Sequence, residues 1–396
     1  MTSSPRQPEH AAGPLKVFLV AVEESGDRLG GALMRALRER SDRPIVFSGV
    51  GGHDMAEAGL DSLHPIDGFS IIGFTAIPAR LPRILRHMRE TKAAVLAQQP
   101  DVVVIIDSPG YSLRLARSVH KSAPQIPIVD YVSPSVWAWR PGRARAMHGF
   151  IDHVLALLPF EPAAHQRLGG PPCTYVGHPL IERVTELRPN AEEARRRLAD
   201  PPVLLVLPGS RTGEIRRHSE VFGEAVRLVR DRIGPLELVV PTTRERRDQV
   251  AAETAKWPVR PRLVTDDAEK RAAFRIARAA LAKSGTVTLE VALAGIPMIA
   301  AYKVSPIDAF IVRRLVRVPS YILANLVLGE NVVPEIVQEE CTPERLADAL
   351  VPLFANTPER RSQVDAFARL DAIMEIGSRT PAARAADVVL STLRRS

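Results

Sequence analysis

Cysteine is scarce in this chain of 396 residues, which contains only Cys173 and Cys341. The two are far apart and fit no metal-ligand spacing, so the sequence predicts neither a disulfide nor a zinc site. Long apolar runs are also missing, since none reaches the roughly 18 residues of a membrane-spanning helix. The polar start, residues 1–14, lacks the layout of a signal peptide. We therefore expect a cytoplasmic protein with a disordered N-terminal tail.

Aromatic residues are few as well, at 5% of the chain, and no basic strip is interleaved with them. Proteins that bind single-stranded nucleic acid use such interleaving, so we expect no nucleic-acid partner. The formal charge of +8 still favours a negatively charged ligand or surface. A phosphate-rich ligand or a lipid surface fits this composition better. At 45% hydrophobic residues, a chain of this length can bury the cores of two ordinary domains.

Short apolar runs alternate with helical patterns along most of the chain. The expected strands are residues 15–22, 44–50, 102–107, 126–133, 153–158, 203–207, 236–241, 262–265, 281–284 and 297–302. The clearest helical patterns are residues 28–40, 214–232, 308–317, 321–328, 342–355 and 358–376. Alternation of this kind indicates an α/β protein with doubly wound parallel sheets.

A change in composition around Gly177 marks a domain junction. We expect a first Rossmann-like domain over residues 15–181 and a second over residues 182–356. The pattern becomes mostly helical after Lys303, and the closing helices, about residues 357–396, are expected to return to the first domain. Ligands of open α/β sheets bind at the carboxyl ends of the strands, so the candidate site residues are sought there.

The segment from Leu281 to Glu290 is the first candidate for a ligand site. It has the pattern of a strand, a tight turn at Ser284, Gly285 and Thr286, and a helix. Backbone N–H groups, two hydroxyls and the positive end of a helix would meet there, which suits a phosphate. Glu290 would lie further along the helix, where it could face a sugar hydroxyl. An ordinary capped turn between a strand and a helix is the alternative.

A second anion site is expected directly after the apolar run 203–207. Gly209, Ser210 and Arg211 lead from this run into a helical pattern, and Arg211 could neutralise a leaving phosphate. The alternative is a plain turn with a surface arginine. Further along, Asn325 is a polar residue in an apolar segment, and it could be a cap or a satisfied interior amide rather than a ligand.

Polar residues also follow strands of the first half. Asp107 ends the run 102–106, where it could serve as a general base, cap the next helix or bind a backbone amide. Residues 23–27 read as a polar turn, which could contact a ligand or cap the next helix. The segment 131–140 is rich in Ser, Pro, Trp and Arg, and it could line a site or pack its two indoles in the interior.

The segment from Gly68 to His87 combines apolar residues with Arg80, Arg83 and Arg86. The residues expected to form its apolar face are Ile71, Ile72, Phe74, Ile77, Leu81, Ile84 and Leu85. Such a face with a basic border suits insertion into an anionic membrane interface. The alternative is a helix that packs on the core and has a solvated basic edge.

Several short motifs occur in a consistent order from about Leu15 to the C-terminal helices. They are residues 24–27, 132–140, 157–161, 177–179 and 207–211, residues 284–286 with 289–290, and Asn325 with Gln338 and Glu339. Each motif alone is weak. Together they resemble the lipid-A-disaccharide synthases, a family of GT-B glycosyltransferases.

The resemblance implies two Rossmann-like domains whose C-terminal sheet edges face one another. It implies an inverting transfer of 2,3-diacylglucosamine from its UDP donor to the 6-hydroxyl of 2,3-diacylglucosamine 1-phosphate, giving a β(1→6) disaccharide and UDP. No metal or other cofactor is implied. The resemblance places the enzyme on the inner face of the inner membrane, as a peripheral protein, and suggests a homodimer with exchanged C-terminal parts. With this function, the membrane reading of the segment 68–87 gains support.

The resemblance also implies roles for individual residues. Asp107 matches a candidate general base, and Ser25 and Asn325 match other site residues. The remaining matches lie on the donor side: Arg211 near the diphosphate, and Gly209, Ser210, Ser284, Gly285, Thr286, Glu290 and Gln338 around UDP. The chain departs from the family pattern on the acceptor side, at Val22, Glu24, Gly110 and Ser112.

Two other readings of the sequence stay open. One is a different GT-B enzyme that uses UDP-N-acetylglucosamine, such as a peptidoglycan-type transferase or a 2-epimerase. The other is a catalytically silent protein that binds a nucleotide sugar at the membrane. An epimerase would act on the donor alone, whereas a silent protein would bind UDP without turnover.

Overall fold

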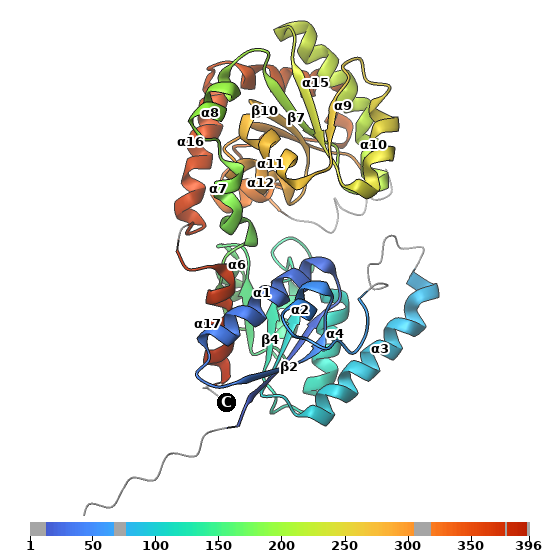
Figure 1. The fold of residues 1–396 in the computed structure, drawn as a ribbon, viewed down its shortest axis with the longest axis vertical. Coiled ribbons are helices and arrows are strands. Elements are labelled where there is room, and N and C mark those ends of the chain that lie inside the picture. The colour runs from blue at the N-terminus through green and yellow to red at the C-terminus, as the bar shows by residue number, and fades with distance from the viewer. Residues whose placement is uncertain (1–12, 67–76, 305–317, 377, 394–396) are drawn as a thin grey trace, which may run out of the picture. The chain divides into compact units, whose positions relative to one another are not determined.

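The computed structural model describes residues 13–66, 77–304, 318–376 and 378–393. The chain forms two compact units (Figure 1). The first comprises the residues up to Pro179 together with those from Arg379 onward, and the second runs from Leu180 to Ser378. The chain therefore returns to the first unit at Arg379, later than the expected boundary near residue 357.

Within the described residues, six parallel strands form the sheet of the first unit, in the order β2-β1-β3-β4-β5-β6. They are β1 (Leu15–Ala21), β2 (Ile45–Val50), β3 (Val102–Ile106), β4 (Ile128–Tyr131), β5 (His153–Ala156) and β6 (Cys173–Tyr175). The first five confirm the sequence prediction. The three residues of β6 were missed because they are half-buried and make no apolar run.

The helices of this unit cover both faces of the sheet. They are α1 (Glu24–Arg40), α2 (His53–Glu57), α3 (Ile77–Gln98), α4 (Pro109–His120), α5 (Gly142–Met147), α6 (Glu161–Arg167) and α17 (Pro381–Leu393). The prediction of a polar turn at residues 23–27 was wrong, because α1 already begins at Glu24. Asp27 is buried, and its carboxylate accepts backbone N–H bonds from Gly52, Asp54 and Met55, which lie far from it in sequence.

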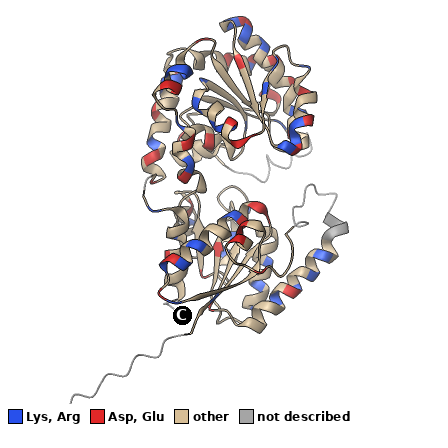
Figure 2. Cartoon of the chain, in the orientation of Figure 1, with Lys and Arg blue, Asp and Glu red and all other residues tan. Residues whose placement is uncertain are grey.

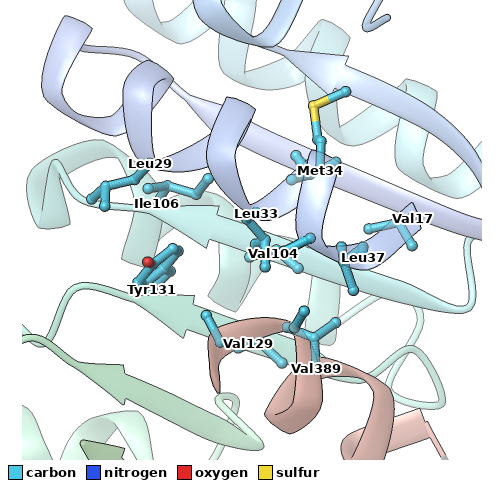
Figure 3. Packing of buried hydrophobic residues seen from close by; sticks show 14 of the residues in the cluster. Val17, Leu29, Leu33, Met34, Leu37, Val104, Ile106, Val129, Tyr131 and Val389 are labelled. Carbon is cyan, nitrogen blue, oxygen red and sulfur yellow. The ribbon is translucent and has the colours of Figure 1, made fainter. Parts of the chain in front are cut away.

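The C-terminal helix α17 completes the core of the first unit by packing on α1. Val389 of α17 lies near Leu33 and Leu37 of α1 and near Val104 and Val129 of the sheet (Figure 3). All five side chains are fully buried. At the surface, Arg40 binds the carboxylate of Asp387 through two hydrogen bonds of 2.5 and 2.9 Å, which joins the two helices again.

The second unit has the same architecture. Within the described residues, its sheet has six parallel strands in the order β12-β11-β10-β7-β8-β9. They are β7 (Val203–Leu207), β8 (Glu237–Pro241), β9 (Arg262–Val264), β10 (Ala279–Lys283), β11 (Met298–Tyr302) and β12 (Glu335–Val337). The expectation of a mostly helical chain after Lys303 overlooked β12, whose three residues pair with the end of β11.

The helices of the second unit are α7 (Val184–Leu187), α8 (Ala191–Leu198), α9 (Thr212–Ile233), α10 (Arg247–Thr254), α11 (Asp267–Ile276), α12 (Val287–Leu293), α14 (Leu323–Leu328), α15 (Pro343–Leu350) and α16 (Pro358–Ile373). α16 packs on α12 and α14 and so belongs to this unit. The helix expected at residues 308–317 lies outside the described residues.

Each sheet changes direction of winding at one place. In the first unit, β1 and β3 are adjacent, and the chain winds outward from them in opposite directions. In the second unit, β7 and β10 hold the same position. Loops at the carboxyl ends of such strand pairs diverge and leave a crevice, which is where open α/β sheets bind ligands. The fold thus marks one candidate place in each unit.

Candidate active site

A pocket of about 820 Å³ lies at this place in the second unit. Its lining includes Gly209, Ser210 and Arg211, which follow β7. It also includes Gly285, Thr286 and Glu290, which follow β10. Two segments that the sequence proposed separately therefore line one cavity, because β7 and β10 are hydrogen-bonded neighbours.

The loop after β7 is built for close approach of the backbone. Gly209 has φ of +121°, and a Cβ atom on it would lie 2.7 Å from Cβ of Glu214. Glu214 accepts the backbone N–H bonds of Ser210 and Arg211, at 3.3 and 3.4 Å. A carboxylate thus lies at the N-terminus of α9, where the helix dipole favours negative charge. The Arg211 side chain is 78% exposed and free to reach a ligand in the pocket.

Lys283, at the end of β10, forms an ion pair with Glu214, with 3.0 Å between Nζ and Oε1. Both side chains are largely buried. Burial alone would raise the pKa of Glu214, but the hydrogen bond and charge of Lys283, with the charge of Arg211, outweigh it and lower the pKa. The ammonium of Lys283 also lies 5.0 Å from the ring centre of Tyr302. The pair joins the two pocket loops, and the sequence analysis did not find it.

The residues of the turn after β10 that the sequence proposed as UDP contacts differ in their surroundings. Gly285 and Thr286 line the pocket. Ser284 is buried, and its hydroxyl donates to the carbonyl of Tyr321 at 3.0 Å, so it holds the turn in place. Glu290 lines the pocket and pairs with Lys270 of α11, with 3.1 Å between Oε1 and Nζ.

Basic side chains outnumber acidic ones in the pocket wall by five to four. Arg244, Arg246 and Lys270 line it in addition to Arg211 and Lys283. Arg246 is oriented by a hydrogen bond of 2.9 Å to the hydroxyl of Thr212, the first residue of α9. Four acids also line the wall: Glu214 and Glu290 are paired with lysines, Asp266 caps α11 by accepting N–H bonds from Ala268 and Glu269, and Asp267 is the first residue of α11. These cations suit a diphosphate.

Behind the pocket, His218 connects α9 to the end of β11. Its Nε2 accepts the backbone N–H of Lys303 at 3.0 Å, so Nδ1 carries the proton and donates to the carbonyl of Glu214 at 2.8 Å. Burial lowers the pKa of this histidine, which favours the same neutral tautomer. His218 was missed in the sequence, where a lone histidine in a helix carries no signal.

Asn325 and Gln338 are placed as structural residues of the second unit. Asn325 is buried, and its amide oxygen accepts the N–H bonds of Val332 and Val333 while its nitrogen donates to the carbonyl of Val333. This is the interior amide that the sequence left open as an alternative. Gln338 accepts the N–H of Val304 at 2.8 Å. Neither belongs to the pocket lining, and their proposed contacts with a ligand stay predictions.

In the first unit, Asp107 and Ser25 meet at the place where β1 and β3 end. The Ser25 hydroxyl donates to the Asp107 carboxylate at 3.1 Å, and the N–H of Ser108 donates to its other oxygen at 2.7 Å. Asp107 and Ser108 both have positive φ, of +55° and +48°. The hydroxyl of Ser112 donates to the Asp107 carbonyl at 2.7 Å and so holds this backbone. Strain of this kind is often found at functional sites.

One buried acid, Asp130, lies near Asp107, and a second, Glu161, lies near Asp130. Asp130 of β4 is 2% exposed; burial raises its pKa well above the usual range, and the charge of Asp107 adds to this effect. Burial raises the pKa of Glu161 to about 7, although Glu161 accepts N–H bonds from Leu158 at 3.0 Å and from the Trp137 indole at 3.1 Å. Glu161 thus holds the segment 131–140 through Trp137. The sequence analysis had named this segment as a loop that could line a site, without a role for Trp137.

The proposed membrane face lies only partly within the described residues. Ile71, Ile72 and Phe74 lie outside them, and the side chain of Ile77 is not described. On α3, Ile84 packs against the core of the first unit, whereas Leu81 and Leu85 are each 41% exposed. The face is therefore divided: part of it serves the core, and part faces outward.

Residues 17–389 match the family described as lipid-A-disaccharide synthetase. The chain is also 59% identical to the lipid-A-disaccharide synthase of Bradyrhizobium diazoefficiens over 380 residues, which cover 96% of this chain and 97% of that protein.

The chain belongs to the lipid-A-disaccharide synthase family.

The family match confirms the resemblance found in the motifs, and with it the assignment as an enzyme of lipid A biosynthesis. A different GT-B enzyme is not favoured. Solved structures support the fold alone: the MurG protein of Acinetobacter baumannii superposes with a TM-score of 0.55 at 16% identity, covering 97% of this chain and 100% of that one. The calicheamicin glycosyltransferase CalG4 gives 0.59 at 17% identity, with 96% and 99% covered. The GT-B class is thus confirmed.

Proposed function

We propose that this chain transfers 2,3-diacylglucosamine from its UDP donor to the 6-hydroxyl of 2,3-diacylglucosamine 1-phosphate, forming a β(1→6) disaccharide and UDP. The observation that carries the proposal is the basic pocket at the β7/β10 crevice in a chain of this family. Membership supplies the reaction, and the pocket supplies a site with the charge that a nucleoside diphosphate needs.

On the donor side, we assign the diphosphate to the loop after β7 and to the cations of the pocket. The Arg211 side chain is mostly exposed, so it can move toward the leaving oxygen and stabilise the negative charge that develops there. Arg244, Arg246 and Lys270 add positive charge to the same wall. In this scheme positive side chains stabilise the departing UDP, so the transfer requires no metal-binding pair of acids. Glu290, held by Lys270, is assigned to a sugar hydroxyl.

On the acceptor side, Asp107 is assigned as the general base. Its carboxylate takes the proton of the attacking 6-hydroxyl as the new bond to the anomeric carbon forms and the bond to UDP breaks. Attack on the face opposite the leaving group inverts the anomeric carbon. Ser25 donates to the carboxylate and orients it, which gives Ser25 a positioning role.

The reaction is tested by measuring UDP release from UDP-2,3-diacylglucosamine in detergent micelles, with and without 2,3-diacylglucosamine 1-phosphate. We expect release that depends on the acceptor and a disaccharide product. Loss of the donor without the acceptor would instead indicate a hydrolase or an epimerase. Binding of UDP without any release would indicate a silent binding protein.

We propose further that α3 places the first unit against an anionic membrane on the inner face of the inner membrane. Leu81 and Leu85 are one helical turn apart and exposed, and Arg83, Arg86 and Arg89 are exposed around them. Lys and Arg are spread along α3 in Figure 2. Each such residue near an anionic surface contributes about 1 kcal/mol. No helix in the described part of the chain is long and apolar enough to cross a membrane.

This surface is tested by sedimentation with vesicles that contain phosphatidylglycerol, compared with neutral vesicles. We expect binding to the anionic vesicles that falls with salt and is lost in the double variant Leu81→Glu, Leu85→Glu. Leu198→Glu is the matched control, since Leu198 is exposed on α8 of the second unit. Equal loss in both variants would contradict the assignment to α3.

A homodimer with exchanged C-terminal parts is also proposed from the family resemblance. The supporting feature is α17, a terminal helix whose apolar face completes a core formed by residues far from it in sequence. Such a helix can fill the same position in a second copy. Light scattering on the eluting protein measures the mass in solution, and a monomer at all concentrations would contradict exchange.

A further inference from the structure

Two histidines and a glutamate of the first unit meet in a cluster that includes neither Asp107 nor any residue of the pocket lining. His64 lies in the segment between α2 and α3, and His87 and Glu90 are three residues apart on α3. Residues three apart on a helix lie on the same side of it. The cluster therefore joins α3 to the segment that follows β2.

The donor atoms of the three residues lie close together. One nitrogen of each histidine and one oxygen of Glu90 all lie within 4.8 Å of one another. The imidazole ring centres are 4.4 Å apart, and Nε2 of His64 is 3.5 Å from Oε2 of Glu90. Ligands of a tetrahedral zinc ion stand roughly 3.3 Å apart, given bonds of about 2.0 Å. Small side-chain rotations would therefore bring the three atoms onto one ion.

The backbone around both histidines is already fixed. The Ser62 hydroxyl donates to the carbonyl of His64 at 2.7 Å and accepts the N–H of Gly51. The hydroxyl of Thr91 donates to the carbonyl of His87 at 2.8 Å. Binding of an ion here costs little free energy for ordering the chain, because these hydrogen bonds already hold the backbone in place.

The types of ligand in the cluster select the kind of ion. The cluster offers two imidazole nitrogens and one carboxylate oxygen, a set that suits ions of the zinc class. Mg²⁺ and Ca²⁺ are disfavoured because these ions prefer oxygen ligands and bind imidazole weakly. Glu90 is half exposed and leaves a path for entry, whereas the histidines are mostly buried.

We propose that His64, His87 and Glu90 form a site for one divalent transition-metal ion of the zinc class, with water completing its coordination. Nε2 of His64 is buried and makes no hydrogen bond in the described residues, and the ion gives it a partner. The bound ion clamps α3 to the preceding segment. It takes no part in sugar transfer, since its ligands are separate from Asp107 and from the residues that line the pocket. The low cysteine count gave no hint of it, because none of the ligands is a cysteine.

The test uses the full chain without an affinity tag, because a histidine tag would bind the same ions. Co²⁺ serves as a spectroscopic probe, and Zn²⁺ is titrated against it by competition. We expect visible absorption bands from one Co²⁺ per chain, displacement by Zn²⁺, and no displacement by Mg²⁺ or Ca²⁺. We also expect Zn²⁺ to raise the melting temperature of the chain.

Three variants remove one ligand each: His64→Gln, His87→Asn and Glu90→Gln. Each should weaken Co²⁺ binding by about tenfold or more. Glu90→Gln keeps the test decisive if a histidine variant fails to fold, because Glu90 is an exposed residue. His53→Gln is the matched control, since His53 pairs with Glu57 at 3.2 Å on α2 with no second histidine and should leave binding unchanged. No binding by the parent chain, or equal binding by all variants, would overturn the proposal.

Discussion

At the scale of single residues, two of the four acids that line the pocket are paired with lysines, and three arginines of the lining lie outside these two pairs. Glu214 is matched by Lys283 and Glu290 by Lys270. Arg211 makes only a long contact of 3.5 Å with Glu214 and is mostly exposed. The arginines outside these pairs can bind an anionic leaving group, because Glu214 and Glu290 are already neutralised by lysines.

Asp107 gives the first prediction. Asp107→Asn keeps an acceptor for the Ser25 hydroxyl and tolerates the positive φ of this position, but it cannot take a proton. We expect kcat to fall by about 10²- to 10⁴-fold while the Kd for UDP stays the same. Steady-state kinetics and calorimetry measure the two quantities. Ser25→Ala should cost less than Asp107→Asn, and near-normal turnover in Asp107→Asn would exclude its role as the base.

Glu161 gives a prediction about pH. Its pKa in the folded chain is raised to about 7 from an ordinary 4.5, chiefly by burial. Between these values the unfolded chain has released the proton and the folded chain still holds it, so stability falls as pH rises and levels off above about pH 7. The loss is on the order of 3 kcal/mol.

Glu161→Gln should remove most of this loss, because glutamine does not titrate. Urea denaturation at pH 5 and pH 8 gives the free energy of unfolding, and the difference between the two should shrink in the variant. Glu39→Gln, at an exposed position on α1, should leave the difference unchanged. An unchanged pH dependence in Glu161→Gln would show that this carboxyl is ionised in the folded chain.

The residues that sequence reasoning found are those that follow predicted strands. Asp107, Gly209 and Thr286 could be placed because parallel strands bring their carboxyl ends to one edge. Contacts between residues distant in sequence could not be foreseen. The pairing of Lys283 with Glu214 needs the register of β7 and β10, and the inward position of Asp27 needs backbone groups beyond β2.

At the scale of elements, the fully buried strands were predicted, whereas two of the three shortest strands were missed. The runs that became β3 and β7 are apolar throughout and fully buried. β6 and β12 have three residues each and were missed, although β9, which is equally short, was predicted. The helical pattern at α16 was recognised, but the sequence could not show which unit the helix packs on. An apolar face can pack against any apolar surface, and its pattern does not specify which one.

The packing of α17 on α1 gives a prediction at this scale. Val389 is fully buried against α1, so Val389→Ala should lower the free energy of unfolding by roughly 2 kcal/mol through lost burial and a small cavity. Val364→Ala is the control, because Val364 is 40% exposed on α16. Thermal denaturation compares the two, and equal stability would mean that α17 adds little to the first core.

At the scale of the whole molecule, the two units have separate cores, and the proposed UDP site lies in the second alone. In differential scanning calorimetry we expect two transitions, of which UDP raises only one. At a UDP concentration of 100 times Kd, the gain for that unit is about 2.7 kcal/mol.

Variants assign the transitions. Val389→Ala should lower the transition that UDP leaves alone, and Arg211→Ala should reduce the shift caused by UDP. If UDP instead raised the transition that Val389→Ala lowers, the donor site would belong to the first unit.

The placement of α17 also sets an order on biosynthesis. The second unit is continuous in sequence, whereas the first needs a helix that is translated only after the second unit. Leu33 and Leu37 therefore lack their packing partner Val389 until the second unit has been translated. Domains usually mature from the N-terminus onward during synthesis. Here the first unit is completed only after the second unit has been translated, so its apolar face is exposed during that time.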